Sequence, residues 1–508
     1  MRMRSSPRCG WCTVYYKQAS QQHCPIAMAA SPSPVRVVSR RTVTPSPPAW
    51  PRELIPLTPW DLSMLDGDYI SKGLLFASPP FPTAAGHLDH LHASLADALA
   101  VYYPVAGRLS TAHHHNNGDG SVVGCSVSVD CNGQGAEILH AIADGVSVAD
   151  ILPPSGAAAG DVPRVVRDFF PLDSAANYDG HELPLLAVQV TELVDGVFLG
   201  FAYNHALSDG TACWGFMNAW AEIARLRLVA PQGSPPPRHT KSPVLDRWSL
   251  DGGAAAPVVL PYADLAALVH RTPAPELRER MLHFSAESLA TLKDRARREL
   301  LDAGDEGAAT AVTTFQALSS LLWRCVTRAR RLPSAATTAC GFPINNRHRL
   351  RPPLPAEYFG NCVNAISTEA VGAAALQANG HGWAAAAVGR AVAAHTDAAI
   401  RAHVAAWVAE PAVSVLRPAA DGGKNGGVVV ASSPRFDVYG CDFGWGKPLA
   451  VRTGRANKFD GNVWLFPGRE GGGSVEVEVA LAPEHMAAFE EVDELWAAVS
   501  PAAGTMDR

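Results

Sequence analysis

Long apolar runs are missing from this sequence of 508 residues. No stretch of about 18 apolar residues runs without a polar interruption, so we expect no transmembrane helix. An excess of positive charge is missing as well. The net charge is −6, and a nucleic-acid surface would need a basic stripe. The composition therefore argues against a nucleic-acid-binding protein, although it leaves room for a local basic patch that holds a phosphorylated ligand.

A disulfide or metal pattern is also missing. Cys9 and Cys12 form a CxxC with His23 and Cys24 nearby, a pattern that zinc and redox sites share. No second CxxC follows, so we favour a chance occurrence and expect no metal site. The other cysteines stand singly, most among apolar neighbours, which is typical of reduced core cysteine in an intracellular protein; they are Cys125, Cys131, Cys213, Cys325, Cys340, Cys362 and Cys441.

Acidic residues are missing from positions 1–52, which are rich in Arg, Ser and Pro. This composition is typical of a transit peptide, which would direct the protein to an organelle. The alternative, which we favour, is that translation begins at Met28 and that the protein is cytoplasmic. In either case the composition predicts disorder in this segment, and we treat residues 1–34 as a disordered extension.

The remaining chain is too long for one ordinary domain. Helical and strand-like patterns mix in residues 35–228 and again in residues 259–500. Residues 229–258 between them are rich in Pro and Gly, which indicates an inter-domain crossover. We therefore predict an α/β protein with two domains of similar size, followed by a tail at 501–508.

Periodicity locates the main elements of both halves. Residues 185–204 predict two strands joined by a turn at Asp195-Gly196. Two glycine-rich segments, "GDEGAAT" (304–310) and "DGGKNGG" (421–427), are predicted loops. Further strands are expected at 121–129, 428–433 and 474–482, and helices at 89–103, 211–228, 285–301, 313–332 and 382–410.

One pattern, His-x-x-x-Asp-Gly, occurs three times and raises the question of catalysis. His115 lies in a run of Asn and Gly between two strands, which predicts a solvated turn. His140 lies among Ala, Ile and Val with no polar partner nearby, which favours a structural histidine. His205 ends a continuous apolar strand and precedes an amphipathic helix, so its imidazole would be held rigidly, as catalysis requires.

Within the third stretch, "NHALSDG" (204–210), the two polar residues have different predicted roles. Asp209 would cap the following helix by accepting backbone N–H bonds. As a buried carboxylate it would need a cation partner. His205 is thus the candidate for chemistry and Asp209 the candidate for structure, although context by itself leaves open that all three histidines are structural.

"NHALSDG" together with "DFGWGKP" (442–448) resembles the plant BAHD acyltransferases, which transfer acyl groups from coenzyme A thioesters. Further blocks are similar to the family across roughly residues 35–500, including "YYPVAGRL" (102–109), "TTFQALSSLLWRC" (313–325) and "LPAEYFGNCV" (354–363). The segment at 57–76 is similar to a little-characterised, acetyltransferase-like clade. The resemblance implies two chloramphenicol-acetyltransferase-like domains, with His205 at their interface.

The resemblance also implies roles for individual residues. His205 would act as general base on a hydroxyl or amine of a small metabolite, with acyl-CoA as co-substrate, no bound cofactor, no metal and no covalent intermediate. Asp209 and Gly210 would support the site, and we predict Arg280 as the cation partner of Asp209. The second motif would be a structural loop formed by Asp442, Phe443, Gly444, Trp445 and Gly446. The protein would work as a monomer.

One departure from the family affects the acceptor site. Relatives often have Trp nine residues before the Asp of DFGWG, where this chain has Ser433. Ser432 or Ser433 would then supply an oxyanion or acceptor contact, with Arg435 beside them; that both serines are plain strand-end residues is equally compatible. Lys293 and Arg295 are our candidates for the phosphates of coenzyme A. Two alternatives stay open: a lyase of the same fold, and a binding protein without turnover.

Overall fold

The structure is a computed structural model that describes residues 33–48, 50–77, 84–152, 157, 159–230, 241–271, 274–413, 426–432 and 434–500. From Pro34 onward the chain forms one compact unit. The predicted extension up to residue 32 and the predicted tail at 501–508 lie outside the described residues. Among those described, no helix combines the length and the apolar character needed to cross a membrane.

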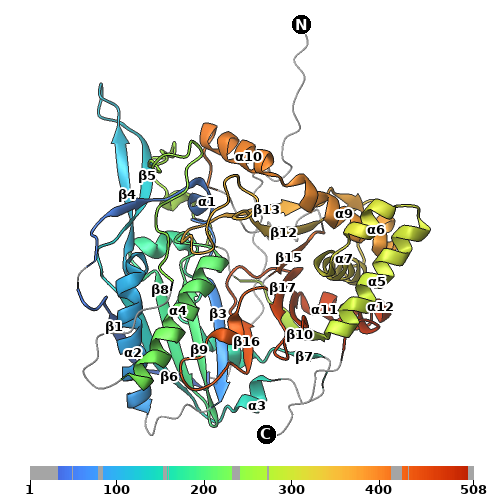
Figure 1. Ribbon diagram of the computed structural model, residues 1–508, viewed down its shortest axis with the longest axis horizontal. Helices are drawn as coiled ribbons and strands as arrows, with labels where there is room; N and C mark the ends of the chain where they lie inside the picture. The colour runs from blue at the N-terminus through green and yellow to red at the C-terminus, as the bar shows by residue number, and fades with distance from the viewer. Residues whose placement is uncertain are drawn as a thin grey trace, which may run out of the picture. The chain divides into compact units, whose positions relative to one another are not determined.

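A six-stranded sheet organises the described part of the first half (Figure 1). Its strands lie in the spatial order β1 (Val35–Val43), β6 (Ala136–Ala143), β8 (Leu186–Glu192), β9 (Gly196–Tyr203), β3 (Ile70–Ala77) and β16 (Ala450–Thr453). The predicted hairpin is therefore present as β8 and β9 at the centre of this sheet, where both strands are almost wholly buried.

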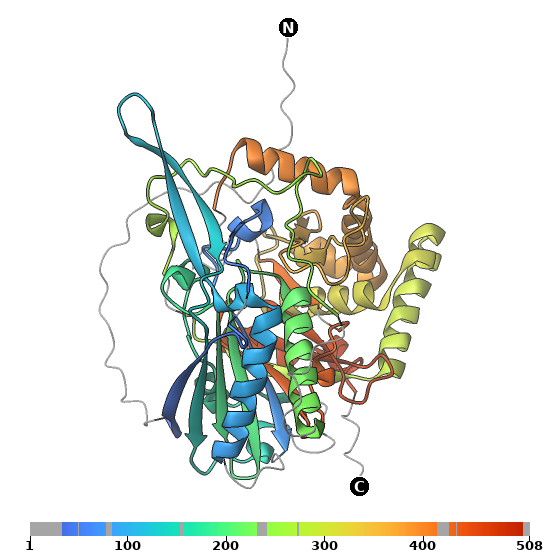
Figure 2. The same ribbon diagram turned by 60° about the vertical axis from the view of Figure 1, so that its left-hand side comes forward.

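Two long helices cover one face of this sheet. They are α2 (Ala84–Val101) and α4 (Gly210–Val229), which lie side by side in Figure 2. Apolar side chains recur along α4 at helical spacing and are buried, as the sequence predicts. Shorter helical elements complete the first half: α1 (Pro59–Leu62), α3 (Val148–Ile151), η1 (Tyr103–Ala106), η2 (Arg164–Phe169), η3 (Asn177–His181) and, beyond the crossover, η4 (Ala266–Leu268).

A seven-stranded sheet organises the described part of the second half. Its order is β13 (Val363–Ser367), β12 (Cys340–Asn345), β15 (Val428–Ser432), β17 (Asn462–Pro467), β18 (Val475–Leu481), β10 (Arg278–Phe284) and β7 (Ala159–Asp161). Each large sheet thus takes one strand from the other half of the chain: β16 pairs with β3, and β7 pairs with β10. The division at residues 229–258 stays a prediction, and these two exchanged strands cross it.

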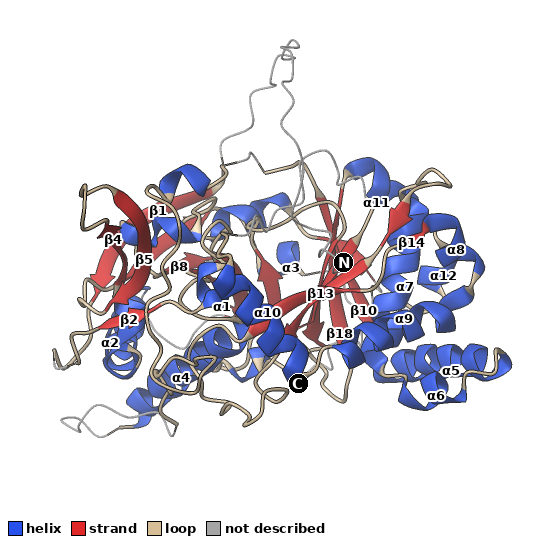
Figure 3. Ribbon diagram, turned by 90° about the horizontal axis from the view of Figure 1, so that it is seen from above, coloured by secondary structure: helices blue, strands red, loops and turns tan. Residues whose placement is uncertain are grey.

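Helices cover one face of the second sheet, as Figure 3 shows for α5, α7 and α9 beside its strands. Alternate residues of the strands, such as Leu282 and Val430, pack under these helices. The intervening residues, such as Trp464 and Phe466, join the core of the first half. The helices of this half are α5 (Ala286–Asp302), α6 (Glu306–Ala311), α7 (Thr314–Ala329), α8 (Ala373–Ala378), α9 (Gly380–Ala394), α10 (Asp397–Ala409), α11 (Pro483–Glu490), α12 (Asp493–Trp496) and the short η5 (Val438–Gly440).

Two smaller sheets complete the described strands. In one, β2 (Leu54–Pro56), β5 (Val122–Asp130) and β4 (Arg108–His115) lie side by side. In the other, β11 (Thr337–Thr338) pairs with β14 (Val371–Gly372). The seven singly placed cysteines are buried and free, so the prediction of reduced core cysteine is confirmed.

Two local predictions are wrong. Val35–Val43 lies in the acid-poor segment predicted to be disordered, yet it forms β1, because its backbone pairs with β6 along its length. "GDEGAAT" contains helix α6 rather than a loop, because Asp305 accepts a hydrogen bond from the N–H of Ala308 and caps it. The crossover is packed where it is described: Arg247 is buried and donates to the carbonyl oxygens of Leu207 and Phe359.

Candidate active site

The turn between β9 and α4 holds the backbone of His205 from both sides. The His205 N–H donates to Oδ1 of Asn177 at 2.6 Å. The His205 carbonyl accepts from Nδ2 of Asn361 at 2.7 Å. Asn177 belongs to the first half and Asn361 to the second, so the position of the histidine depends on both halves. Asn204 locks the start of the same turn by donating to the carbonyl of Asn177 and accepting from the N–H of Ala206.

His205 lies deep in the protein, and the residue keeps some exposed surface. Its Nδ1 is buried and has no hydrogen-bond partner that meets normal geometry among the described residues. Burial lowers the pKa of His205, and its own carbonyl, the charge of Asp209 and the side chain of Asn361 oppose that effect only in part. A neutral imidazole at neutral pH follows, which is the form that accepts a proton.

Asp209 supports the turn without contacting the ring in any hydrogen bond of the described residues. Its carboxylate caps α4 by accepting the N–H of Ala212 at 3.1 Å. It also accepts the N–H of Cys362 and forms a two-pronged ion pair with Arg347, with N···O distances of 2.6 and 3.1 Å. Both members of the pair are 1% exposed. Asp209 therefore has both features that the sequence predicts, the helix cap and a cation partner.

The predicted cation partner, Arg280, is wrong. Arg280 lies on β10 on the same face as Leu282, which packs under the helices of the second half. It pairs there with Asp161 and Glu490 at 2.8 and 2.5 Å. Arg347 occupies the position instead, in the loop between β12 and β13, where it also donates to the carbonyls of Tyr358 and Gly360.

Gly210, the first residue of α4, lies close to a side chain of the second half. A Cβ at this position would lie 3.1 Å from the ring of Phe436 in the second half. A side chain here would therefore push against the segment that follows β15. The predicted supporting role of Gly210 fits this contact.

The second motif forms a tight loop packed against the first half. Oδ1 of Asp442 accepts the N–H groups of Gly444 and Gly446, whose φ values of +97° and +102° favour glycine. Phe443 is buried and packs edge-on against Trp220 of α4, with ring centroids 4.9 Å apart. Trp445 packs against Phe76 of β3. The loop thus delivers the chain to β16, which fits the predicted structural role.

The predicted acceptor contacts are not assembled around His205. Ser433 lies outside the described residues. Ser432 ends β15 on the same face as Val428 and Val430, which pack under the helices, so alternation turns it away from the first half. Arg435 is exposed. An oxyanion donor from Ser432 is therefore not supported by its position.

The candidate contacts for coenzyme A lie on α5 in the helical layer of the second half. Arg295 is committed to carboxylates: it pairs with Glu299 at 2.9 Å and with Glu494 at 3.1 Å. Lys293 is half-buried on the same helix and makes no ion pair among the described residues. Neither residue contacts the turn that holds His205.

The other two histidines lie elsewhere. His115 is exposed at the end of β4, beside a turn whose tip is also exposed, so the predicted solvated turn is confirmed. His140 lies on β6, and its Nε2 is 2.5 Å from Oε1 of Glu192 on the neighbouring strand β8. The expectation that His140 lacks a polar partner is therefore wrong, because parallel pairing brings in a residue from 52 positions away.

Sequence reasoning missed the residues that hold the turn. Asn361 binds the carbonyl of His205 and also donates twice, from N and Nδ2, to Oδ1 of Asp61. Asp61 in turn accepts from Thr58 and closes the cap of α1. Asn361 lies in the block "YFGNCV", which is part of the family resemblance. The resemblance thus pointed to this segment but gave no role for Asn361. Arg347 had no comparable signal.

A model of the transferase family matches residues 33–496. The chain belongs to the BAHD acyltransferase family. This BAHD chain is 36% identical over 437 residues to an uncharacterized acetyltransferase of Arabidopsis thaliana, covering 85% of this chain and 92% of that one. It is 35% identical to BAHD acyltransferase DCR of the same plant, over 88% of this chain and 89% of that one. It is therefore an acyltransferase that uses acyl-CoA.

Solved structures show the BAHD fold in this chain. Vinorine synthase aligns with a TM-score of 0.64 at 20% identity, over 92% of this chain and 99% of that one. TRI101 of F. sporotrichioides, complexed with coenzyme A and T-2, aligns with a TM-score of 0.63 at 16% identity, over 89% of this chain and all of that one. The predicted chloramphenicol-acetyltransferase-like α/β fold is confirmed.

Proposed function

We propose that His205 is the general base with which this acyltransferase activates a hydroxyl or amine of a small metabolite. The observation that supports this most is the combination at His205: a backbone held from both halves, a residue that is not fully buried, and a pKa lowered by burial. A general base must be fixed in place and unprotonated at the working pH, and this residue meets both conditions.

The reaction proceeds by direct transfer. Nε2 of His205 accepts the proton of the acceptor as its oxygen or nitrogen attacks the thioester carbonyl of acyl-CoA. A tetrahedral oxyanion forms, which hydrogen-bond donors must stabilise. The intermediate collapses, the C–S bond breaks, and the thiolate of coenzyme A leaves. The thiolate then takes the proton from the imidazolium, so His205 returns to its neutral form.

Asp209 works as a structural residue in this scheme. Both of its oxygens are engaged by Arg347, and one also accepts the N–H of Cys362. A carboxylate bound in this way has no need of the imidazole as a partner. The turn that carries His205 therefore keeps its shape independently of the protonation of the ring.

The test is release of free coenzyme A by purified protein. A panel of acyl-CoAs is offered with pooled alcohols and amines, thiol release is measured, and product masses identify donor and acceptor. We expect release that depends on both acyl-CoA and acceptor and that His205→Ala nearly abolishes. Absence of release with every donor, or equal release by wild type and His205→Ala, would contradict the proposal. Turnover that needs no acyl-CoA would instead indicate the lyase.

A further inference from the structure

A second titratable side chain, Lys72, lies deep between the two sheets and has no part in the scheme above. It is the third residue of β3 and pairs with Phe201 of β9 on one side and Thr453 of β16 on the other. Its ammonium crosses to the second sheet, where it lies 5.2 Å from the ring centroid of Trp464 and 5.4 Å from that of Phe466. Two aromatic faces on one strand thus flank a lysine from the other half.

Lys72 makes neither a hydrogen bond nor an ion pair with any residue that the structure describes. The charge of the Glu478 carboxylate acts on Lys72. Glu478 is shared, since its Oε1 accepts from Lys458 at 2.7 Å and from the hydroxyl of Thr453, whereas its Oε2 is buried and has no hydrogen-bond partner among the described residues. A buried ammonium without a carboxylate partner is costly, so the position favours an additional anion.

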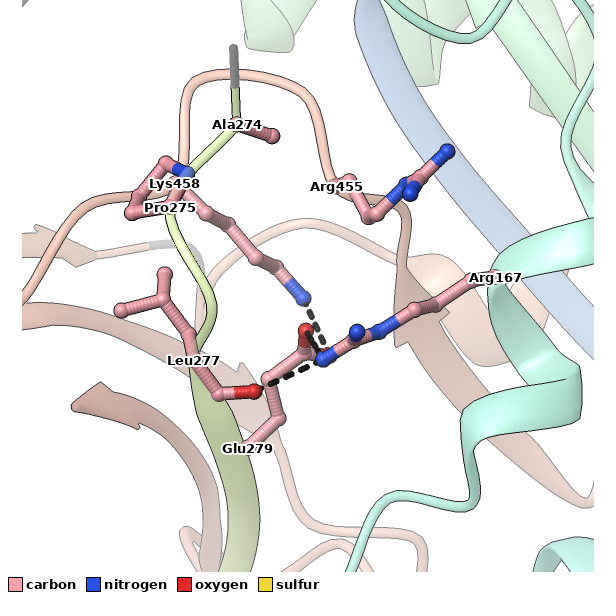
Figure 4. A pocket seen from close by; sticks show the side chains of 7 residues that line it. All are labelled: Arg167, Ala274, Pro275, Leu277, Glu279, Arg455 and Lys458. Atoms are coloured by element: carbon pink, nitrogen blue, oxygen red, sulfur yellow. Dashed lines mark hydrogen bonds and ion pairs between the residues drawn. The ribbon is translucent and has the colours of Figure 1, made fainter. Parts of the chain in front are cut away.

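The charges around Lys72 form a chain that starts at the surface. Figure 4 shows its outer end, a pocket where Glu279 binds both Arg167 and Lys458. Lys458 also binds Glu478, which lies further inside the protein. Lys72 is the innermost cation and makes no ion pair among the described residues. Three cations, Arg167, Lys458 and Lys72, therefore face two carboxylates, and one positive charge remains at the inner end. A single negative charge would balance the chain.

Lys72 is also accessible in part. The residue keeps exposed surface, whereas Lys458 beside it is 7% exposed. Burial nevertheless lowers the pKa of Lys72 to about 7, so its ammonium is only partly hydrated. His205 follows Phe201, the strand partner of Lys72, by four residues. Because β9 ends at Tyr203, the two backbone positions are at most about 13 Å apart, a distance that a small metabolite spans.

We propose that Lys72, flanked by Trp464 and Phe466, binds a carboxylate group of a substrate whose other end reaches His205. The carboxylate accepts hydrogen bonds from the ammonium of Lys72 and supplies the missing negative charge. It belongs either to the acyl group of the donor or to the acceptor. The catalytic role of this carboxylate site rests on the proposed function of His205. Binding of a carboxylate to Lys72, however, is measurable without turnover.

The first test measures binding. The neutral fraction of Lys72 reacts with an amine-directed acetylating reagent, and mass spectrometry gives the rate of labelling at this residue. We expect 4-hydroxybenzoate to slow labelling if the site serves the acceptor, and malonyl-CoA, compared with acetyl-CoA, to slow it if the site serves the acyl group. The neutral amide 4-hydroxybenzamide should protect far less. Equal protection by acid and amide, or protection by neither carboxylate, would overturn the proposal.

The second test uses variants. Lys72→Met keeps the length and apolar stem of the side chain but removes the charge, and Lys72→Arg keeps the charge. For the protecting carboxylate we expect Lys72→Met to weaken binding by about 10- to 100-fold, as for loss of a hydrogen bond between charged groups, with part of it regained in Lys72→Arg. Lys241→Met, on an exposed lysine, is the matched control. Unchanged binding in Lys72→Met would refute the site, whereas His205→Ala should bind the carboxylate like wild type even if no transfer occurs.

Discussion

The same six-residue pattern, His-x-x-x-Asp-Gly, has three different surroundings in this molecule. In the β4–β5 hairpin, His115 and Asp119 are exposed. At the end of β6, His140 is held by Glu192, and Asp144 is exposed. Only in the third stretch are the aspartate buried and the histidine backbone held by the other half of the chain. The pattern itself therefore carries no function, and the contacts made from outside it do.

The glycine of each pattern shows the same difference. Gly120 and Gly145 have φ values of +70° and +74° and serve turns, where glycine is favoured because it lacks a Cβ. Gly210 is the first residue of a helix of 20 residues, and a Cβ there would lie 3.1 Å from the ring of Phe436. Asp-Gly thus ends a strand in two cases and begins a long helix in the third. Only the helix gives the preceding histidine a rigid support.

The largest expected effect is loss of the ring in the third stretch. His205→Ala should lower kcat about 10²- to 10⁴-fold, the usual contribution of a general base. His115→Ala and His140→Ala should retain the activity of wild type within a few-fold, because neither ring lies in the proposed site. Steady-state kinetics with one identified donor and acceptor measures all three. A comparable loss of kcat in either control would show that the His-x-x-x-Asp-Gly pattern itself, and not the contacts around it, determines which histidine is catalytic.

The next effect concerns the buried aspartate. Asp209→Asn leaves the buried charge of Arg347 without its partner, which typically costs about 3–5 kcal/mol of unfolding free energy. Asp119→Asn, at an exposed position, should change stability by no more than about 0.5 kcal/mol. Urea unfolding gives both values.

A double variant separates the ion pair from the cap. Asp209→Leu with Arg347→Met removes both charges, so it should cost less than the sum of the two single variants. If the loss of unfolding free energy in the double variant equalled the sum of the losses in the two single variants, the ion pair would not be the reason that Asp209 stabilises the protein.

The pattern of neighbouring residues was sufficient to predict many of the features that distinguish the three stretches. The hairpin β8–β9, the helix α4 and the exposed turn at His115 follow from alternation, helical spacing and turn residues, which are properties of neighbouring positions. The cap at Asp209 follows from the same local rules. The family resemblance then singled out the third stretch, and with it the fold.

Contacts between distant segments were not predictable in this way. Arg347 is 138 residues from Asp209, and no local pattern distinguishes it from Arg280. The face on which Arg280 lies depends on where β10 sits in the second sheet, between β18 and β7. The exchange of β16 and β7 between the two sheets has the same origin. Glu192, the partner of His140, was missed because strand pairing and not sequence proximity places it.

A smaller effect is expected from the residue that joins the two halves at the histidine. Asn361→Ala removes the donor to the His205 carbonyl and leaves Asp61 with fewer partners. We expect kcat to fall about 10-fold, in the range for loss of a buried hydrogen bond, with little change in KM. Asn116→Ala in the hairpin tip is the matched control, since its side chain serves only the local turn. An unchanged kcat in Asn361→Ala would mean that the turn holds His205 without the second half.

The smallest expected effect is a shift in the pH dependence of kcat/KM. It gives the sharpest distinction between the His205 stretch and the exposed hairpin. Burial lowers the pKa of His205 below its usual value near 6.5. The base is lost only when the ring is protonated, so kcat/KM should fall on the acid side with an apparent pKa below 6.5. The Asn361 side chain acts in the opposite direction and raises the pKa of His205. Asn361→Ala should therefore move the acid limb further toward low pH, while Asn116→Ala leaves it unchanged. A merely structural role of Asn361 would lower the rate and leave the limb in place, and a shift toward higher pH would contradict the effect of the Asn361 side chain on the pKa of His205.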